Sequence, residues 1–377
     1  MIKESVNILS QFVDNPNGLF TYLESLKPSA VVVMDNPSLC AEIRARIPGC
    51  IGIHRSYDPH EHEWHTAAGM SPSAWLDRYA PQILDGNVLQ CLNEPQGYGD
   101  LTPLVSWCVS IMAQAHQRGI RLCLPHFGVG HPKEDFSPQL DPLWQAFAQF
   151  PEHLLGLHEY FQLDPLAEPF RTGRFRSILT RCQQLGLPPP KIVITEAGRD
   201  VGGGLNDGWK GAGFSEQVYA SKLNQQASIY LNTPVIAMCV FCMGHGAGGN
   251  WESFDIQHAQ IVQQSMIDWN RSHPVTQPNY GTRIDSGKVV LVNASAVNVR
   301  SAPNTGMPIL GKLFGGEDLP YWSQPVNTWW QIEWNGQLAY TSSTYVRFEQ
   351  EDAINAWIQE MQVHNDAIAD LLSNPPS

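Results

Sequence analysis

Over the first 270 residues, the hydrophobic and polar positions alternate between two kinds of segment. Short apolar runs rich in branched residues predict buried strands, and each is followed by a longer stretch with apolar positions at helical spacing. The predicted strands are residues 5–10, 31–35, 50–55, 88–92, 121–126, 154–160, 192–195 and 235–241. The predicted helices are residues 17–26, 38–47, 71–84, 102–118, 142–150, 174–185, 215–231 and 256–269.

Eight strands, each followed by a helix, predict that residues 1–270 form a (β/α)8 or TIM barrel. Alternation of strands and helices implies parallel pairing, and eight such units of about 250 residues in total make up this barrel. The rival fold, a doubly wound open sheet, would need a phosphate-cradling glycine turn after an early strand. The sequence has none, because the glycines at 202–204 follow the seventh strand and lack the Lys-Ser/Thr of a phosphate loop.

The pattern changes after residue 270. Residues 271–286 contain prolines and lose periodicity, which predicts a linker at a domain boundary. Residues 287–348 read as short strands and turns, with Asn335-Gly336 as a hairpin signal, and predict a small all-β barrel. Its predicted strands are residues 288–292, 298–300, 309–313, 329–334 and 337–341. Residues 349–377 carry apolar positions at helical spacing and predict a C-terminal helix and tail.

Two of the predicted barrel strands end in a glutamate. Glu94 follows the run at 88–92, and Glu196 follows the run at 192–195. Because desolvating a carboxylate is costly, a charge at the tip of a buried strand indicates a function. Catalytic residues of such barrels lie at the carboxyl ends of the strands. The two carboxylates are therefore predicted to face one pocket.

These motifs resemble those of the clan A glycoside hydrolases, which are retaining enzymes on a (β/α)8 barrel. The resemblance is carried by Asn93-Glu94-Pro95 at the fourth strand and Thr195-Glu196 at the seventh. It implies that Glu94 is the acid/base and Glu196 the nucleophile. It also implies that Asn93 hydrogen-bonds the 2-hydroxyl of the sugar.

The chemistry explains why two carboxylates are needed. Cleaving a glycosidic bond requires a proton on the leaving oxygen and an anion at the anomeric carbon, and a retaining enzyme holds the two carboxyl groups about 5–5.5 Å apart. Glu196 must then be ionised, and Glu94 is expected to be protonated, its pKa raised in part by its charged neighbour. The alternative is that both glutamates are surface residues or members of structural ion pairs.

The sixth strand supplies further candidates. His158 and Tyr160 alternate around Glu159, so they share one face of the strand. The clan resemblance implies that Tyr160 donates a hydrogen bond to the nucleophile. His158, on the same face, is predicted to lie in the same pocket, and both are candidate substrate-binding residues. Glu159 then points towards the helices, unless the register slips by one residue and brings it into the pocket.

Other residues have candidate supporting roles in binding substrate. Arg55 after the third strand would hold the nucleophile ionised, although the clan more often takes this arginine from the second strand, and His54 is its alternative. His126 at the end of the fifth strand either lines the cleft or is a structural histidine. The eighth strand lacks the tryptophan platform that the clan often has there, so His245 or Trp251 would serve instead.

Composition narrows the class of partner. The net charge of −13 argues against nucleic acid or an anionic membrane as partner. The loop at 58–65 is rich in His and Glu, but it is not a His-Glu-x-x-His helix, so a polar wall of a sugar cleft is favoured over a metal site. We expect neither metal nor cofactor. The sequence does not predict an oligomeric state.

The eight cysteines fall mostly in apolar patterns, which is typical of free, buried thiols. Cys239 and Cys242 form a C-x-x-C, but within an apolar run, which disfavours a redox or metal role. The N-terminal residues lack a basic segment followed by an apolar core, so no signal peptide is expected. The expected location is therefore cytoplasmic, or outside the cell after release by a non-classical or phage route.

The second domain resembles bacterial SH3 domains. The matching residues are 298–303, 315–317, 329–332, 335–340 and 345–346. Such domains often accompany cell-wall hydrolases and bind peptidoglycan, so the resemblance implies a cell-wall glycan or another polysaccharide as substrate. The alternatives are a non-catalytic carbohydrate- or wall-binding protein on the same barrel, and a phage-type lytic enzyme.

Overall fold

A computed structural model provides the structure of the chain. It describes residues 3–56, 67, 69–82, 84, 86–95, 99–133, 138–202, 204–231, 233–273, 284–292, 294–300, 305, 309–326, 329–334, 337–342 and 344–348. The chain divides into two compact units, Met1–Val275 and Thr276–Ser377. The predicted loop at 58–65, the predicted helix at 349–377 and most of the predicted linker lie outside the described residues.

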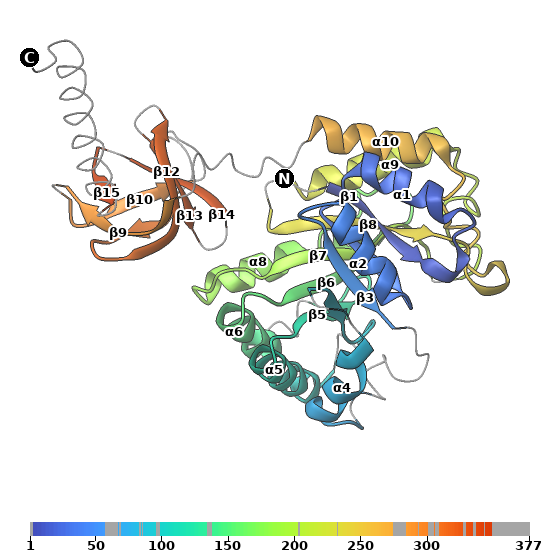
Figure 1. The fold of residues 1–377 in the computed structure, drawn as a ribbon, viewed down its shortest axis with the longest axis horizontal. Helices are drawn as coiled ribbons and strands as arrows, with labels where there is room; N and C mark the ends of the chain where they lie inside the picture. The colour runs from blue at the N-terminus through green and yellow to red at the C-terminus, as the bar shows by residue number, and fades with distance from the viewer. Residues whose placement is uncertain are drawn as a thin grey trace, which may run out of the picture. The chain divides into compact units, whose positions relative to one another are not determined.

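The first unit is a closed barrel of eight parallel strands in chain order, as the sequence predicted (Figure 1). The strands are β1 (Lys3–Leu9), β2 (Ala30–Met34), β3 (Ile51–Arg55), β4 (Val88–Gln90), β5 (Arg121–Phe127), β6 (Leu154–Phe161), β7 (Lys191–Arg199) and β8 (Val235–Met243). Pairing of β1 with β8 closes the barrel. This closure excludes the doubly wound open sheet.

Helices surround the barrel and cover its outer face (Figure 1). They are α1 (Pro16–Leu26), α2 (Pro37–Arg46), α4 (Pro72–Tyr79), α5 (Thr102–Gln117), α6 (Asp141–Gln149), α7 (Pro169–Thr172), α8 (Phe175–Gln184), α9 (Glu216–Ile229) and α10 (Gln260–Ser272), with short 3-10 turns at Ser10–Phe12, Ala80–Gln82 and Ala247–Gly249. Side chains cap several of the helix starts. Ser71, for example, accepts a hydrogen bond from the Ala74 amide at 3.2 Å, and Pro72 occupies the first turn.

Alternation along the strands separates two apolar layers. One layer packs between the strands and the helices, and the other is formed by strand residues alone and fills the barrel. The second layer consists mainly of small or branched side chains: Ala30, Val32, Ile53, Val88, Cys123, Leu154, Val193, Ala237 and Cys239. All eight cysteines of the chain are free and buried, as expected. At the carboxyl ends of the strands, buried polar side chains replace this apolar filling.

The second unit is an antiparallel sheet with strand order β11-β10-β14-β13-β12-β9-β15. The strands are β9 (Ile284–Leu291), β10 (Val297–Arg300), β11 (Ile309–Leu313), β12 (Asp318–Val326), β13 (Trp329–Trp334), β14 (Gln337–Ser342) and β15 (Val346–Phe348). Sequence reasoning missed β12 and β15. Pro320 and Pro325 lower the strand signal of β12, since proline cannot donate to a ladder, and β15 has only three residues.

The core of this second unit surrounds Trp330. Its indole Nε1 donates a hydrogen bond to the Val346 carbonyl at 2.7 Å, which ties β13 to β15.

Among the described residues of the whole chain, no helix combines the length and hydropathy that crossing a lipid bilayer requires.

Candidate active site

Glu196 lies inside β7, where the strand carries a bulge. Leu157 of β6 pairs with Ile194, but the next residue, His158, pairs with Glu196, so Thr195 is an additional residue in β7. The register against β8 shifts across the same step. The sequence predicted that the strand ends at residue 195, whereas β7 continues to Arg199.

Each carboxylate oxygen of Glu196 has its own donor. Arg55 Nη1 donates to Oε1 at 2.7 Å, and Tyr160 Oη donates to Oε2 at 2.8 Å. Only 12% of the Glu196 side chain is exposed. Burial, and then the charge of Glu196, raise the pKa of Tyr160 well above its usual value, so the phenol stays a neutral donor. The two contacts fix the orientation of the carboxylate.

Glu94 lies beyond β4 on a strained turn. It has a left-handed φ of 42°, and Leu92 has a φ of 61°. Positive φ values are uncommon outside glycine and are often found at functional sites. The backbone of Asn93, between them, forms a parallel bridge with His126 of β5. Gly128 leaves room for the carboxylate, since a Cβ there would lie 3.2 Å from Glu94 Oε1.

His158 lies between the two carboxylates. Its Nδ1 is 2.8 Å from Glu94 Oε1 and 3.4 Å from Glu196 Oε2. These two oxygens are therefore no more than 6.2 Å apart, the sum of the two distances. The sequence placed His158 in the pocket as a substrate-binding residue, but it did not place the ring between the glutamates.

This imidazole reverses the expectation for the pKa of Glu94. Burial raises that pKa, but the hydrogen bond and charge of His158, with the charges of Arg55 and His131, outweigh burial and lower it. Burial lowers the pKa of His158, whereas the charge of Glu196 and the bond to Glu94 raise it above 6.5 overall. The expected raised pKa of Glu94 is thus wrong, because the hydrogen bond to His158 and the charges near Glu94 outweigh the effect of burial.

His126 does not line the cleft. The side chain has no exposed surface, and its ring nitrogens lie 2.8 Å from Thr195 Oγ1 and 2.8 Å from the Cys123 carbonyl. The prediction that it binds substrate is corrected, because both polar atoms are engaged inside the protein. Of the two alternatives left open for His126, the structure contains the structural histidine.

Glu159 points towards the helices, as expected, and the register does not slip. Its Oε2 accepts from Tyr230 Oη at 2.8 Å, and its Oε1 from the Phe175 amide at 3.2 Å. Burial raises its pKa to about 7, although these hydrogen bonds and Arg174 lower it. Glu159 therefore joins β6 to α8 and to the residue after α9.

Trp251 belongs to an aromatic cluster near Glu196. Its ring centroid lies 5.3 Å from that of Phe241, and Phe241 lies 6.5 Å from Tyr160. His245 is turned towards another group, with its Nε2 3.7 Å from Asp14. Of the two candidates for the missing platform, Trp251 therefore has the closer link to Glu196.

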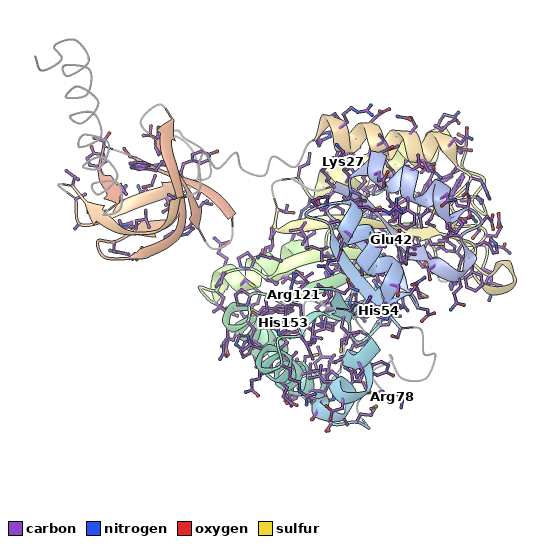
Figure 2. The ribbon with its side chains drawn as sticks, in the orientation of Figure 1. Lys27, Glu42, His54, Arg78, Arg121 and His153 are labelled. Atoms are coloured by element: carbon purple, nitrogen blue, oxygen red, sulfur yellow. The ribbon has the colours of Figure 1, made fainter. Side chains whose placement is uncertain are left out.

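The remaining predicted residues lie as follows. The Asn93 side chain is half-buried near Glu94, and its Oδ1 has no hydrogen-bond partner among the described residues. His54, labelled in Figure 2, hydrogen-bonds Ser56 through Nε2 at 3.2 Å, so Arg55 rather than His54 contacts Glu196. Among the described residues, no group of three or more histidine, cysteine or acidic side chains could hold a metal ion.

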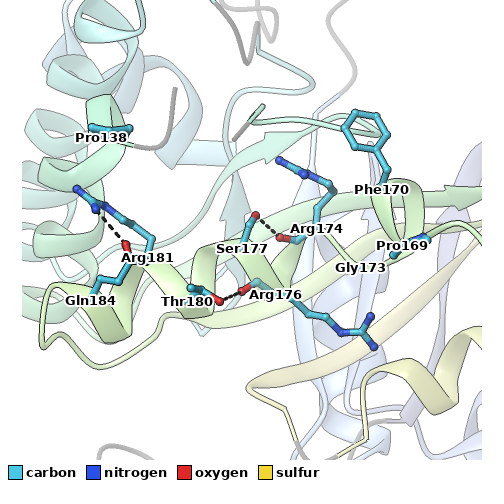
Figure 3. A pocket seen from close by; sticks show the side chains of 10 residues that line it. All are labelled: Pro138, Pro169, Phe170, Gly173, Arg174, Arg176, Ser177, Thr180, Arg181 and Gln184. Carbon is cyan, nitrogen blue, oxygen red and sulfur yellow. Dashed lines mark hydrogen bonds between the residues drawn. The ribbon is translucent and has the colours of Figure 1, made fainter. Parts of the chain in front are cut away.

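A separate groove of about 710 Å³ lies along α8 (Figure 3). Its size is in the range of small-molecule sites, but its polar groups are largely engaged. Ser177 donates to the carbonyl of Arg174, just before α8, and Thr180 to a carbonyl within α8. Arg181 forms a bidentate pair with Asp141. Neither catalytic candidate lines it.

Comparisons with known proteins identify the second unit. Similar solved structures include CJP38, a β-1,3-glucanase of Cryptomeria japonica pollen (13% identity, 67% of this chain and 95% of that one, TM-score 0.44). They also include a family 5 xyloglucanase from Paenibacillus pabuli (13% identity, 72% and 98%, TM-score 0.46). These likenesses are too distant to carry weight, and no curated protein sequence matches the chain. Residues 295–347 match the bacterial SH3 domain family, so the second unit contains a bacterial SH3 domain.

Proposed function

We propose that the barrel is a retaining glycoside hydrolase in which Glu196 is the nucleophile and Glu94 the acid/base. The observation that carries the proposal is the pair of carboxylates, Glu94 after β4 and Glu196 in β7, that share His158 Nδ1. In the first step Glu196 bonds to the anomeric carbon while the leaving oxygen takes a proton from Glu94. In the second, Glu94 removes a proton from water, and the water oxygen displaces Glu196 with net retention.

The separation of the pair supports retention. An inverting pair is about 6.5–9.5 Å apart, to admit a water between the carboxylate and the sugar, whereas a retaining pair is about 5–5.5 Å apart. The facing oxygens of Glu94 and Glu196 are no more than 6.2 Å apart, the sum of their distances to His158. The space between the two side chains therefore suits direct attack by Glu196.

His158 supplies the proton that Glu94 uses. Between pH 4.5 and 6.5 the proton of the pair lies on the imidazole of the ligand-free barrel, because the pKa of His158 is raised from 6.5 and that of Glu94 is lowered from 4.5. The side chain of Glu94 is 51% exposed, so a bound glycan removes solvent from it and favours the neutral carboxyl. The proton then passes along the 2.8 Å hydrogen bond from Nδ1 to Glu94.

We further propose that the substrate is a cell-wall glycan or another polysaccharide. The bacterial SH3 domain at residues 295–347 supports a wall glycan, since its unit is separate from the barrel and could bind the polymer while the barrel cuts it. Sedimentation with purified peptidoglycan compares the full chain with Met1–Val275. We expect the full chain to co-sediment and the barrel alone to remain largely in solution, and equal sedimentation would contradict this role.

Turnover on a panel of aryl glycosides and purified peptidoglycan tests the proposed enzyme. Wild-type protein should cleave at least one substrate, and NMR of the first-formed product should show the anomer of the substrate. The variant Glu196→Ala should cleave none. If wild-type protein binds a glycan without cleaving any, the barrel is a carbohydrate-binding protein; inverted product would exclude the retaining mechanism.

A further inference from the structure

The bulge in β7 turns two consecutive side chains to the inside of the barrel. In a regular strand, neighbouring side chains point to opposite faces. Here Thr195 contacts His126 of β5, and Glu196 contacts Tyr160 of β6. A bulge re-aims a side chain in this way and is often found next to an active site. The direction of Glu196 therefore depends on how Thr195 is held.

The ring of His126 holds the Thr195 side chain. The Cys123 carbonyl, 2.8 Å from Nε2, can only accept, so Nε2 carries a hydrogen. In the neutral ring Nδ1 is then an acceptor, and it lies 2.8 Å from Thr195 Oγ1. The other acceptor near this hydroxyl, the Leu157 carbonyl, is 3.4 Å away, beyond the usual O–H···O range.

The neighbouring strand makes room for this ring. Gly156 of β6 has no side chain where the imidazole lies, and a Cβ there would be 2.2 Å from His126 Nδ1. Asn7 of β1 holds the backbone of the same bulge, because its Nδ2 donates to the Thr195 carbonyl at 3.2 Å. Asn7, His126 and Thr195 are all fully buried. We call the three residues the bulge clamp.

We propose that the bulge clamp positions the nucleophile, with Asn7 and His126 acting on Glu196 through Thr195. This inference rests on the proposed function for its effect on catalysis. The clamp fixes the backbone one residue before Glu196, while Arg55 and Tyr160 fix the carboxylate itself. Because a displacement of about 1 Å costs on the order of 100-fold in rate, loss of the clamp lowers turnover without removing any group that touches substrate.

Two matched substitutions test the clamp in the full chain. Thr195→Val removes the hydroxyl at nearly constant volume, and Thr195→Ser keeps it. On the aryl glycoside that wild-type protein cleaves fastest, we expect kcat of Thr195→Val to fall about 10- to 100-fold with KM nearly unchanged. Thr195→Ser should recover most of the rate. Thr172→Val is the control, since it removes another buried hydroxyl bond, to the Pro165 carbonyl.

NMR of 15N-labelled histidines gives a readout that needs no turnover. In wild-type protein, His126 should carry its proton on Nε2, and His158 should titrate above its ordinary pKa. In Thr195→Val the pKa of His158 should fall, because Glu196 moves away from its Nδ1. A wild-type His126 protonated on Nδ1 alone would overturn the clamp, and so would a Thr195→Val variant with unchanged kcat and unchanged His158 titration.

The kinetic and the NMR measurements together separate this inference from the proposed function. If wild-type protein cleaves no glycoside but the His158 titration shifts in Thr195→Val, the clamp is supported and the proposed enzyme is not. If wild-type protein is a glycosidase and Thr195→Val changes neither kcat nor the His158 titration, the enzyme is supported and the clamp is overturned.

Discussion

Glu196 and Glu94 face the same histidine but differ in how the protein holds them. Glu196 is 12% exposed and has a donor on each oxygen, whereas Glu94 is 51% exposed and is held through one oxygen on a turn with positive φ. A nucleophile benefits from one fixed direction, because the reacting atoms must be aligned. An acid/base must give a proton to the leaving oxygen in one step and take a proton from water in the next. The difference in how the two side chains are held thus matches the roles that we propose for them.

Removal of Glu196, the carboxylate that is held by a donor on each oxygen, should have the largest effect on turnover. Glu196→Ala leaves no nucleophile, so we expect kcat to fall on the order of 10⁶-fold on every glycoside, as for a nucleophile in other enzymes. Initial rates over a range of leaving groups measure this. A loss confined to poor leaving groups would assign Glu196 the acid role instead and reverse the comparison.

Removal of Glu94 should have a smaller and selective effect. Glu94→Ala should lower the rate about 10²- to 10⁴-fold for poor leaving groups, the usual contribution of acid–base catalysis. Dinitrophenyl glycosides need little protonation, so their first step should survive, and a burst of dinitrophenol should precede slow turnover. Equal losses for both kinds of substrate would contradict the assignment.

The shared proton can be tested through His158. His158→Gln removes the group that holds this proton, so we expect the alkaline limb of kcat/KM to move to lower pH. The raised pKa of His158 also stabilises the folded barrel below pH 6.5, and this contribution is lost as pH rises through the folded pKa. Rate and urea-unfolding profiles against pH measure both effects. An alkaline limb at the wild-type position would exclude a role for His158 in proton supply.

A buried carboxylate outside the candidate active site sharpens the contrast. Glu4 of β1 is as buried as the clamp residues, its oxygens have no partner among the described residues, and burial raises its pKa to about 8. Between pH 4.5 and about 8, the unfolded chain loses this proton while the folded chain keeps it, so stability falls as pH rises. The unfolding free energy of Glu4→Gln, relative to that of wild-type protein, should therefore be a few kcal/mol greater at pH 8 than at pH 4.5. Urea unfolding of both proteins at the two pH values measures this difference. The same change of unfolding free energy with pH in both proteins would contradict it.

Much of the barrel was predictable because its strands follow simple periodicity. Alternation correctly predicted that Glu159 points outwards from β6, because the strand is regular over this stretch. The pattern could not predict that Thr195 is an extra residue in β7, since a bulge depends on pairing with β6 and β8. His126 was misassigned because its ring contacts Thr195 across the barrel interior, and a contact between β5 and β7 does not follow from alternation along either strand.

The location of the His158 ring between the two glutamates could not be predicted from the sequence either. That its ring lies between Glu94 and Glu196 follows from the ends of three strands meeting in space, and the pKa of Glu94 follows from that contact. By contrast, the interaction of Tyr160 with Glu196 agrees with what the clan resemblance implied. Single positions were thus easier to assign than the coupling between them.

Rescue by azide tests the central claim, the division of roles between the two glutamates, most directly. Glu94→Ala supplied with a dinitrophenyl glycoside and azide should regain turnover and release a glycosyl azide of retained configuration, because azide attacks the intermediate on Glu196. Glu196→Ala under the same conditions should release the inverted glycosyl azide, because azide attacks the substrate itself. Inverted product from Glu94→Ala would show that the two roles are reversed, and full activity of both variants without azide would show that the active site lies elsewhere.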